Sequence, residues 1–253
     1  MHSQEVGAGE LLANLSIGYI VLAAFVLTTI RLILTPNRGP FARSVSELVE
    51  SLILAGVLVF MIIRPFFMQA FFIPTESMEP TLQGHESGFN ARTGQQYAST
   101  IHDHIFVNKL TYRLRDPRRG EIVVFRAPKE ADIEGGRKNE NILIKRIVGV
   151  PGDTIQVKDG AVWRDGKRIS EPVCDAQASN EPCIKEKMQP YQSGDAQFAV
   201  DRPLKLGPGE YFVMGDNRNA SWDSRYWGVV ARDRIIGEAS FIFWPLNRIH
   251  FVH

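Results

Sequence analysis

A strongly apolar strand with two adjacent cations is predicted in residues 141–153, which read NILIKRIVGVPGD. Because successive side chains of a strand point to opposite faces, Leu143, Lys145 and Ile147 are expected on one face. The strand runs into a Pro-Gly pair that suits a type II turn. The segment therefore predicts a buried strand that carries a lysine among large apolar side chains.

Brief apolar runs separated by turn residues continue this pattern along most of the chain. Asp159-Gly160 and Asp165-Gly166 suit tight hairpins, and short runs rich in β-branched and aromatic residues fit strands better than helices. Such runs lie at residues 105–107, 122–125, 211–214 and 241–244. We therefore expect a mainly β fold class, with an antiparallel β domain over residues 74–253.

The first 73 residues have a different, apolar character. Residues 11–30 carry no charged side chain, and at ~1.5 Å per residue they form about 30 Å of helix, enough to cross a bilayer. A second apolar stretch, 48–67, is weaker because Glu50 interrupts it, and its uncharged part, 51–63, also suits a buried core helix or an interfacial segment. We expect a membrane anchor over residues 1–73, with transmembrane helices at 11–30 and 48–67.

The orientation of this anchor follows from its positive charges. The short loop 31–47 holds Arg31, Arg38 and Arg43, and such loops stay in the cytoplasm. If the second segment spans, everything after it is extracytoplasmic. A cleaved secretory signal is the alternative to a retained first span, but the N-terminal tail has no Lys or Arg, and no small-residue cleavage site leads into a folded domain.

Composition argues against several classes of function. The chain has 253 residues, with 29 Lys and Arg against 28 Asp and Glu, and this balance disfavours nucleic acid as a partner. No spacing of His or Cys is typical of a metal site, so we expect no metal and no cofactor.

Three segments lack the strand pattern. Residues 84–99 and 127–139 are polar or charged and are expected to be mobile surface loops. Cys174 and Cys183 lie in the third, where they leave one disulfide or two free thiols. Outside the cytoplasm the disulfide between Cys174 and Cys183 is expected.

Two segments contain candidate reactive groups. Ser77 lies between Pro74 and Pro80, which restrict the backbone on both sides of it. A serine alone is a poor nucleophile, so a proline-stiffened linker is the alternative. Lys145 loses hydration of its charged form among apolar neighbours, so its pKa should fall below the ordinary ~10.4 and a neutral amine could accept a proton. The alternative is a lysine whose head reaches water.

A third segment, residues 215–225, reads GDNRNASWDSR and is dense in residues that form loops and hydrogen bonds. If its second half is extended, Ser221, Asp223 and Arg225 share a face. Asp223 and Arg225 would then form a bracing ion pair and leave the Ser221 hydroxyl to hold another polar group. The alternative is an ordinary polar surface loop.

Four segments, in this order, resemble the type I signal peptidase family of membrane-anchored serine peptidases: SMEPTL at 77–82, GEIVVF at 120–125, KRIVGVPGD at 145–153 and GDNRNASWDSR at 215–225. The resemblance implies a hydrolase that cleaves N-terminal signal peptides from exported preproteins after small residues of the Ala-x-Ala type. It also implies a place in the bacterial inner membrane, with the catalytic domain on the periplasmic side.

The same resemblance implies a Ser-Lys dyad, with Ser77 as nucleophile and Lys145 as general base. It implies an oxyanion hole formed by the Thr75 hydroxyl and the Ser77 backbone N–H. The chain departs from the family pattern at Thr75 and Glu76, around which many relatives have Ser or Gly, although Thr75 keeps a hydroxyl, and at Glu121, where Asp is usual. In residues 215–225 the resemblance assigns Ser221 to orientation of the lysine amine, and Asp223 and Arg225 to bracing of the loop.

An extended signal peptide is implied to lie beside the segments of Ser77 and Lys145, bound by backbone pairing and two shallow pockets that admit alanine one and three positions before the cut. The residues that match pocket-lining positions are Phe71, Ile73, Met78, Leu82, Leu143 and Ile144. Membrane lipid is a second expected partner, through phenylalanines that dip into the outer leaflet. These phenylalanines are Phe66, Phe67, Phe71 and Phe72.

Two other classes of protein share some of these features. A Ser-Lys autoprotease of the SOS-repressor type has a related catalytic pair, but such proteins are soluble and begin with a DNA-binding module, whereas this chain begins with apolar segments. A catalytically silent, membrane-anchored peptide-binding relative would keep the pockets without cleaving. Ser77 and Lys145 are both present, which favours an enzyme.

The pH dependence of activity tests the role given to Lys145. Because desolvation lowers the pKa of an amine, the acid limb of the kcat/KM profile should have its midpoint on the order of pH 8–9. The profile is measured in one detergent with a substrate that does not titrate. A midpoint at ~10.4 would contradict the desolvation of Lys145, and one at ~6.5 would indicate a histidine base.

Overall fold

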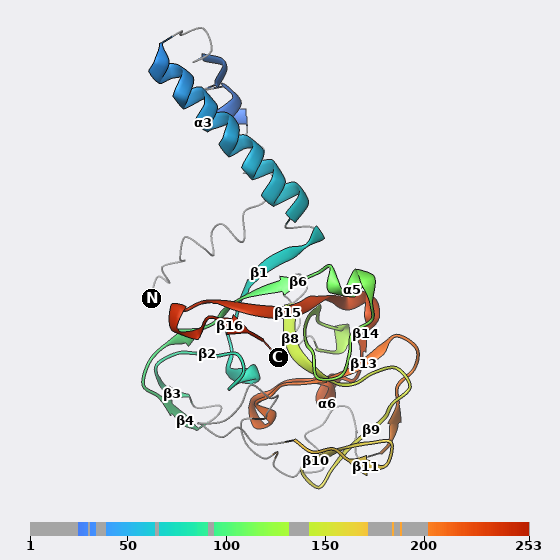
Figure 1. Cartoon of the computed structure of the whole chain (residues 1–253). Helices are drawn as coiled ribbons and strands as arrows, with labels where there is room; N and C mark the ends of the chain where they lie inside the picture. The colour runs from blue at the N-terminus through green and yellow to red at the C-terminus, as the bar shows by residue number, and fades with distance from the viewer. Residues whose placement is uncertain are drawn as a thin grey trace. The chain divides into compact units, whose positions relative to one another are not determined.

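The computed structural model describes residues 25–29, 31–33, 39–63, 66–90, 94–131, 142–171, 184, 188 and 202–252 (Figure 1). The chain divides into two compact units, Met1–Ala70 and Phe71–His253. Helices make up most of the described part of the first unit, which also contains the start of strand β1, and β-sheets dominate the second.

Helix α3 (Pro40–Val57) is the main described element of the N-terminal unit, and the π-helix η1 (Leu58–Ile63) follows it directly. Pro40 stands in the first helical turn, where its missing N–H breaks no helical hydrogen bond. Glu50, the charge that interrupts the second apolar stretch, forms an ion pair with Arg31 at 2.9 Å.

The two predicted membrane spans fall in this unit. The span expected at 48–67 corresponds to most of α3 and to η1. The span expected at 11–30 lies outside the described residues, apart from 25–29, which are helical. Within the ranges that the structure describes, no helix has both the length and the apolar character needed to cross a membrane.

The second unit is built on a large antiparallel sheet, as the mainly β prediction requires. Its strand order is β1-β6-β15-β7-β8-β13-β14, and β16 also pairs with β15. β8, which contains Lys145, pairs with β7 on one side and β13 on the other. The strands are β1 (Met68–Phe72), β6 (His104–Asn108), β7 (Ile122–Arg126), β8 (Ile142–Gly149), β13 (Glu210–Met214), β14 (Val230–Ala231), β15 (Ile235–Trp244) and β16 (His250–Phe251).

A second, four-stranded sheet follows β8 in the chain, with the order β11-β10-β9-β12. Its two hairpins turn at Asp159-Gly160 and Asp165-Gly166, and all four of these residues have positive φ. That conformation is the one a two-residue type I′ hairpin requires, so the hairpin prediction is confirmed. The strands are β9 (Thr154–Lys158), β10 (Ala161–Arg164), β11 (Lys167–Arg168) and β12 (Leu204–Lys205).

The prediction of a surface loop at 84–99 is wrong in part, because short strands occupy much of this segment. β2 (Gly84–His85) pairs with β5 (Ile101–His102), and β3 (Gly88–Asn90) pairs with β4 (Gln95–Tyr97). These strands are two or three residues long and mostly polar, so they lack the apolar alternation from which strands are recognised. The other predicted loop, 127–139, is described only as far as residue 131.

Short helical turns complete the described part of the second unit. The α-helical turns are α5 (Thr111–Leu114) and α6 (Ser224–Trp227). The 3-10 turns are η2 (Glu76–Met78), η3 (Lys129–Ala131), η4 (Arg218–Ala220), η5 (Arg232–Arg234) and η6 (Leu246–Arg248).

Apolar side chains pack against both faces of the large sheet. On β7, Val123 and Phe125 belong to one buried cluster, whereas Val124 belongs to another. On β8, Ile147 belongs to the first cluster and Leu143 packs against it, while Ile144 packs against the second. The predicted alternation along β8 is confirmed, and the sheet forms the centre of the core.

Candidate active site

Ser77 lies in η2, a three-residue turn that follows β1. The residue before the turn, Thr75, has an extended backbone, and the Glu79 N–H closes the turn by donating to the Glu76 carbonyl oxygen at 3.1 Å. Ser77 is only 6% exposed. The turn therefore holds the Ser77 side chain at a defined place in a largely buried environment.

Lys145 reaches Ser77 from β8. Its Nζ donates to Ser77 Oγ at 2.8 Å and to the Ile144 carbonyl oxygen at 2.8 Å, and the residue is 3% exposed. A nucleophile and a general base must lie within ~2.6–3.2 Å for direct proton transfer. The structure thus brings together two residues 68 positions apart, in a geometry that lets a neutral amine take the serine proton.

The Thr75 hydroxyl lies on the exposed side of this pair. It donates to Ser77 Oγ at 3.3 Å. The Thr75 hydroxyl is therefore beside the oxygen that would attack a substrate carbonyl.

The loop between β13 and β14 contains the buried pair Asp223 and Arg225. Arg225 Nε donates to Asp223 Oδ1 at 2.7 Å and its Nη2 donates to Asp223 Oδ2 at 2.8 Å, so the pair is bidentate. The Gly215 N–H also donates to Asp223 Oδ2, at 3.0 Å. Burial opposes ionisation of Asp223, but the charge and hydrogen bonds of Arg225, with the Gly215 N–H, hold the pKa of this carboxyl below its usual value.

Ser221 and Gly215 bring this loop against the Ser77 turn. A Cβ atom built on Gly215 would lie 2.3 Å from Ser221 Oγ and 2.4 Å from the Ser77 carbonyl oxygen. Only glycine therefore fits at this contact. The buried Ser221 hydroxyl stands close to the Ser77 turn, and a hydrogen bond from it helps to lower the pKa of the Asp223 carboxyl.

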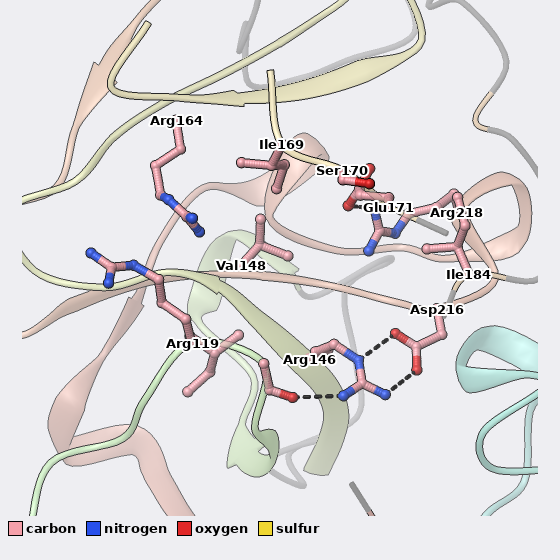
Figure 2. Close-up of a pocket in the computed structure, with 12 residues that line it drawn as sticks. Arg119, Arg146, Val148, Arg164, Ile169, Ser170, Glu171, Ile184, Asp216 and Arg218 are labelled. Atoms are coloured by element: carbon pink, nitrogen blue, oxygen red, sulfur yellow. Dashed lines mark hydrogen bonds and ion pairs between the residues drawn. The ribbon is translucent and has the colours of Figure 1, made fainter. Parts of the chain in front are cut away.

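Sequence reasoning missed a second buried ion pair, between Arg146 and Asp216 (Figure 2). Arg146 Nε and Nη2 donate to the two Asp216 oxygens at 2.8 and 2.7 Å, and the Thr81 hydroxyl donates to Asp216 Oδ2 at 2.7 Å. The signal was present in the sequence, because Arg146 follows Lys145 in an apolar strand and so points to the opposite face. A buried arginine stays charged and needs a carboxylate.

Asn217, also missed, ties the loop to the Ser77 turn directly. Its backbone N–H donates to the Ser77 carbonyl oxygen and its Nδ2 donates to the Glu76 carbonyl oxygen, both at 3.2 Å. No pattern in the sequence indicates these contacts, since they join residues more than a hundred positions apart.

A third missed group lies on the other side of the turn. Glu79 is 3% exposed, and its Oε1 forms a short hydrogen bond with His85 Nδ1. The Tyr97 hydroxyl donates to Glu79 Oε2 at 3.0 Å, and the Tyr97 ring stacks on the His85 ring with centroids 3.9 Å apart. The strands β2 and β4 are thereby fixed against the residue that closes the Ser77 turn.

The six predicted pocket residues are divided between the two faces of the sheet. Ile73, Met78 and Leu82 are core residues of one cluster, and Phe71 and Ile144 pack against it with part of their surface exposed. Leu143 packs against the other cluster. The structure therefore brings five of the six predicted residues, all except Leu143, to one apolar cluster.

Two other expectations concern cysteines and metals. The expected disulfide between Cys174 and Cys183 lies outside the described residues. In the described ranges, no group of three or more His, Cys, Asp and Glu side chains is arranged to hold a metal ion.

A serine hydroxyl beside a lysine amine in a β domain is one of the arrangements that serine peptidases use. The comparison with known families agrees, since the model of the family described as signal peptidase, peptidase S26, matches residues 45–244. The chain belongs to this family of serine peptidases.

Individual relatives cover most of the chain. A probable signal peptidase I-2 from Synechocystis is 36% identical over 203 residues, which are 80% of this chain and 75% of the relative. Signal peptidase I from Leptolyngbya laminosa is 34% identical over 220 residues, which are 85% of this chain and 90% of the relative. A crystal structure of a signal peptidase I from Enterococcus faecalis, 28% identical, covers 50% of this chain and 98% of its own, with a TM-score of 0.34.

Replacement of Asp223 by asparagine should lower the free energy of unfolding by about 3–5 kcal/mol at neutral pH, because Arg225 stays buried without its counter-charge. The folded-state pKa of Asp223 lies below its unfolded value of 3.8, so its stabilisation is complete above that value and is lost as the pH falls through the folded pKa. The difference between wild type and Asp223→Asn should therefore shrink below about pH 4.

Chemical denaturation of both proteins over a pH series measures this difference. Asp233→Asn, at an exposed position of η5, is the control and should change stability little. A difference that stays constant as the pH falls would contradict the depressed pKa of Asp223.

Gly215→Ala should lower peptidase activity by about a hundredfold, because the new methyl group must displace the Ser221 side chain or the Ser77 backbone. Gly56→Ala introduces the same methyl group where no atom lies within 4 Å, and it should leave activity unchanged. Initial cleavage rates, with circular dichroism to verify folding, measure the effect. A folded Gly215→Ala variant with wild-type activity would show that the contact between the loop and the turn is not needed.

Proposed function

We propose that this chain cleaves signal peptides from exported preproteins by means of a Ser-Lys dyad, with Ser77 as nucleophile and Lys145 as general base. The observation that carries the proposal is the 2.8 Å contact between Lys145 Nζ and Ser77 Oγ. Its relatives are named signal peptidase I, which supports the choice of substrate.

In the proposed reaction the neutral Lys145 amine takes the Ser77 proton while Ser77 Oγ bonds to the carbonyl carbon of the scissile peptide. The Thr75 hydroxyl and the Ser77 N–H stabilise the oxyanion that forms. The Lys145 ammonium then gives its proton to the departing amine as the C–N bond breaks, which leaves an ester on Ser77. Lys145 then takes a proton from a water molecule, whose oxygen bonds to the ester carbonyl carbon. As the bond from this carbon to Ser77 Oγ breaks, the Lys145 ammonium returns the proton to Ser77 Oγ and the acid product leaves.

Desolvation supports the role of Lys145 as a base. Lys145 is 3% exposed and lies between Leu143 and Ile147 along one face of β8, so its protonated form would gain little hydration. Asp223 and Arg225, which brace the loop, hold Gly215 and Ser221 against the Ser77 turn. We assign Ser221 to the packing of this wall and to orientation of the lysine amine when substrate is bound.

A free edge of β8 supports backbone pairing with the substrate. β13 pairs with β8 from Arg146 to Gly149, and no described strand pairs with residues 142–145 on that side. An extended peptide could add to this edge by β-augmentation, which would lead it past Lys145. Phe71 and Ile144 are partly exposed at the same end of the core and would limit the side chains that fit, in favour of alanine one and three positions before the cut.

We further propose that residues 1–73 anchor residues 74–253 to the inner membrane, with the catalytic domain on the periplasmic side. Large apolar side chains of α3 and of the residues after it are exposed, as expected of a surface that contacts lipid. Among them are Leu48, Leu52, Leu54, Phe66 and Phe67.

Ser77→Ala and Lys145→Ala should each lower cleavage of a preprotein by at least about 10²–10⁴-fold, because the nucleophile and the base act as a unit. Incubation of the full chain with a preprotein, followed by N-terminal sequencing of the product, measures both the rate and the cleavage site. Ser87→Ala and Lys129→Ala, at exposed positions, are the matched controls and should keep the wild-type rate.

A folded Ser77→Ala or Lys145→Ala variant that keeps more than about a tenth of the rate would remove the dyad assignment. Cleavage after a bulky residue as readily as after alanine would contradict the proposed specificity. Absence of cleavage by the wild-type protein would favour the silent peptide-binding relative.

A further inference from the structure

A pocket of about 160 Å³ lies between β8, the loop before β7 and the β10–β11 hairpin (Figure 2). It is distinct from the substrate edge of β8, and its wall is rich in arginine. The charged residues that line it are Arg119, Arg146, Arg164, Arg218, Glu171 and Asp216. Four guanidinium groups thus face two carboxylates.

Three of the four arginines have a carboxylate partner. These pairs neutralise each other and stiffen the wall, as bidentate guanidinium–carboxylate pairs do. They are Arg146 with Asp216, Arg218 with Glu171, and Arg119 with Asp153.

Arg164, at the end of β10, is the exception. Its guanidinium forms no hydrogen bond or direct ion pair with any residue in the described ranges, although the side chain is partly buried in the pocket wall. The positive charge of Arg164 helps to lower the pKa of the Asp153 carboxyl, but that carboxylate already accepts two hydrogen bonds from Arg119. Figure 2 shows the side chains of Arg119 and Arg164 reaching the same side of the pocket.

Other charges nearby do not supply the missing partner. Asp165 lies in the exposed hairpin turn, outside the pocket wall, and its carboxylate accepts from the Thr154 N–H at 2.9 Å. Lys167 and Arg168, on the same hairpin, are exposed and add positive potential beside Arg164. The mouth of the pocket therefore favours an anion.

We propose that this pocket binds a phosphoryl anion, either inorganic phosphate or the phosphate of a lipid headgroup, through Arg164 and Arg119. Guanidinium groups bind phosphate oxygens by strong, charge-assisted hydrogen bonds. Arg119 lies in the loop before β7 and Arg164 ends β10, and their guanidinium groups lie on the same side of the pocket. A phosphoryl group has enough oxygens to accept hydrogen bonds from both guanidinium groups.

The test uses the full chain in a neutral detergent, with binding of inorganic phosphate measured by calorimetry and by the midpoint of thermal unfolding. Sodium chloride at equal ionic strength is the reference, since it screens charge without filling the pocket. Wild-type protein should bind phosphate saturably. Arg164→Gln should weaken this binding by roughly 10–100-fold, the equivalent of one charge-assisted hydrogen bond.

Arg168→Gln is the matched control, because it removes one cation from the same hairpin outside the pocket wall, and it should change affinity by less than about threefold. A soluble glycerophosphodiester, which resembles a lipid headgroup, is titrated in parallel. Tighter binding of the diester assigns the pocket to a lipid, and tighter binding of inorganic phosphate assigns it to the free ion.

Three results would overturn the proposal. They are the absence of any effect of either phosphate compound beyond that of chloride, unchanged binding by the folded Arg164→Gln variant, and an equal loss of affinity in Arg164→Gln and Arg168→Gln. Equal loss would mean that the hairpin attracts anions only by its general charge.

Discussion

The burial of a lysine amine against a serine hydroxyl is the constraint on which the rest of this site depends. A protonated amine loses much of its hydration when it is removed from water, and Lys145 is only 3% exposed. Its Nζ contacts two neutral oxygens, Ser77 Oγ and the Ile144 carbonyl oxygen. The apolar packing that makes this burial possible comes from β7 and β8, at the centre of the large sheet.

Arg146, the residue after Lys145 on β8, is also buried, but it is buried as a charged group with a carboxylate partner. Arg146 points to the other face, and a guanidinium group does not lose its proton in proteins. It is neutralised by Asp216, which also accepts from Thr81 in the segment after the Ser77 turn. β8 thus holds the lysine proposed as the base on one face and, on the other, an ion pair that Thr81 joins to the segment after the Ser77 turn.

Features set by local sequence were predicted correctly. The Asp-Gly pairs predicted the two hairpins, and the alternation of apolar residues predicted which side chains of β8 share a face. Both features depend on residues adjacent in the chain. Strands β2 to β5 were missed because they are short and polar. The residues proposed for the dyad could be named because their segments resemble a known family, but the contacts of Asn217 and Glu79 could not, since their partners are set by tertiary packing.

The size of the Ser77 turn explains why so many distant residues converge on it. A turn of three residues has one internal hydrogen bond, from the Glu79 N–H, and cannot fix a side chain by itself. Its position is instead set from outside, by Asn217 and Gly215 on one side and by the Glu79–His85–Tyr97 contacts on the other. Because these contacts are to the backbone or to Glu79, the Ser77 hydroxyl stays available for reaction. The proposed dyad therefore depends on a wall of residues outside the Ser77 turn, to which the loop from Gly215 to Arg225 contributes.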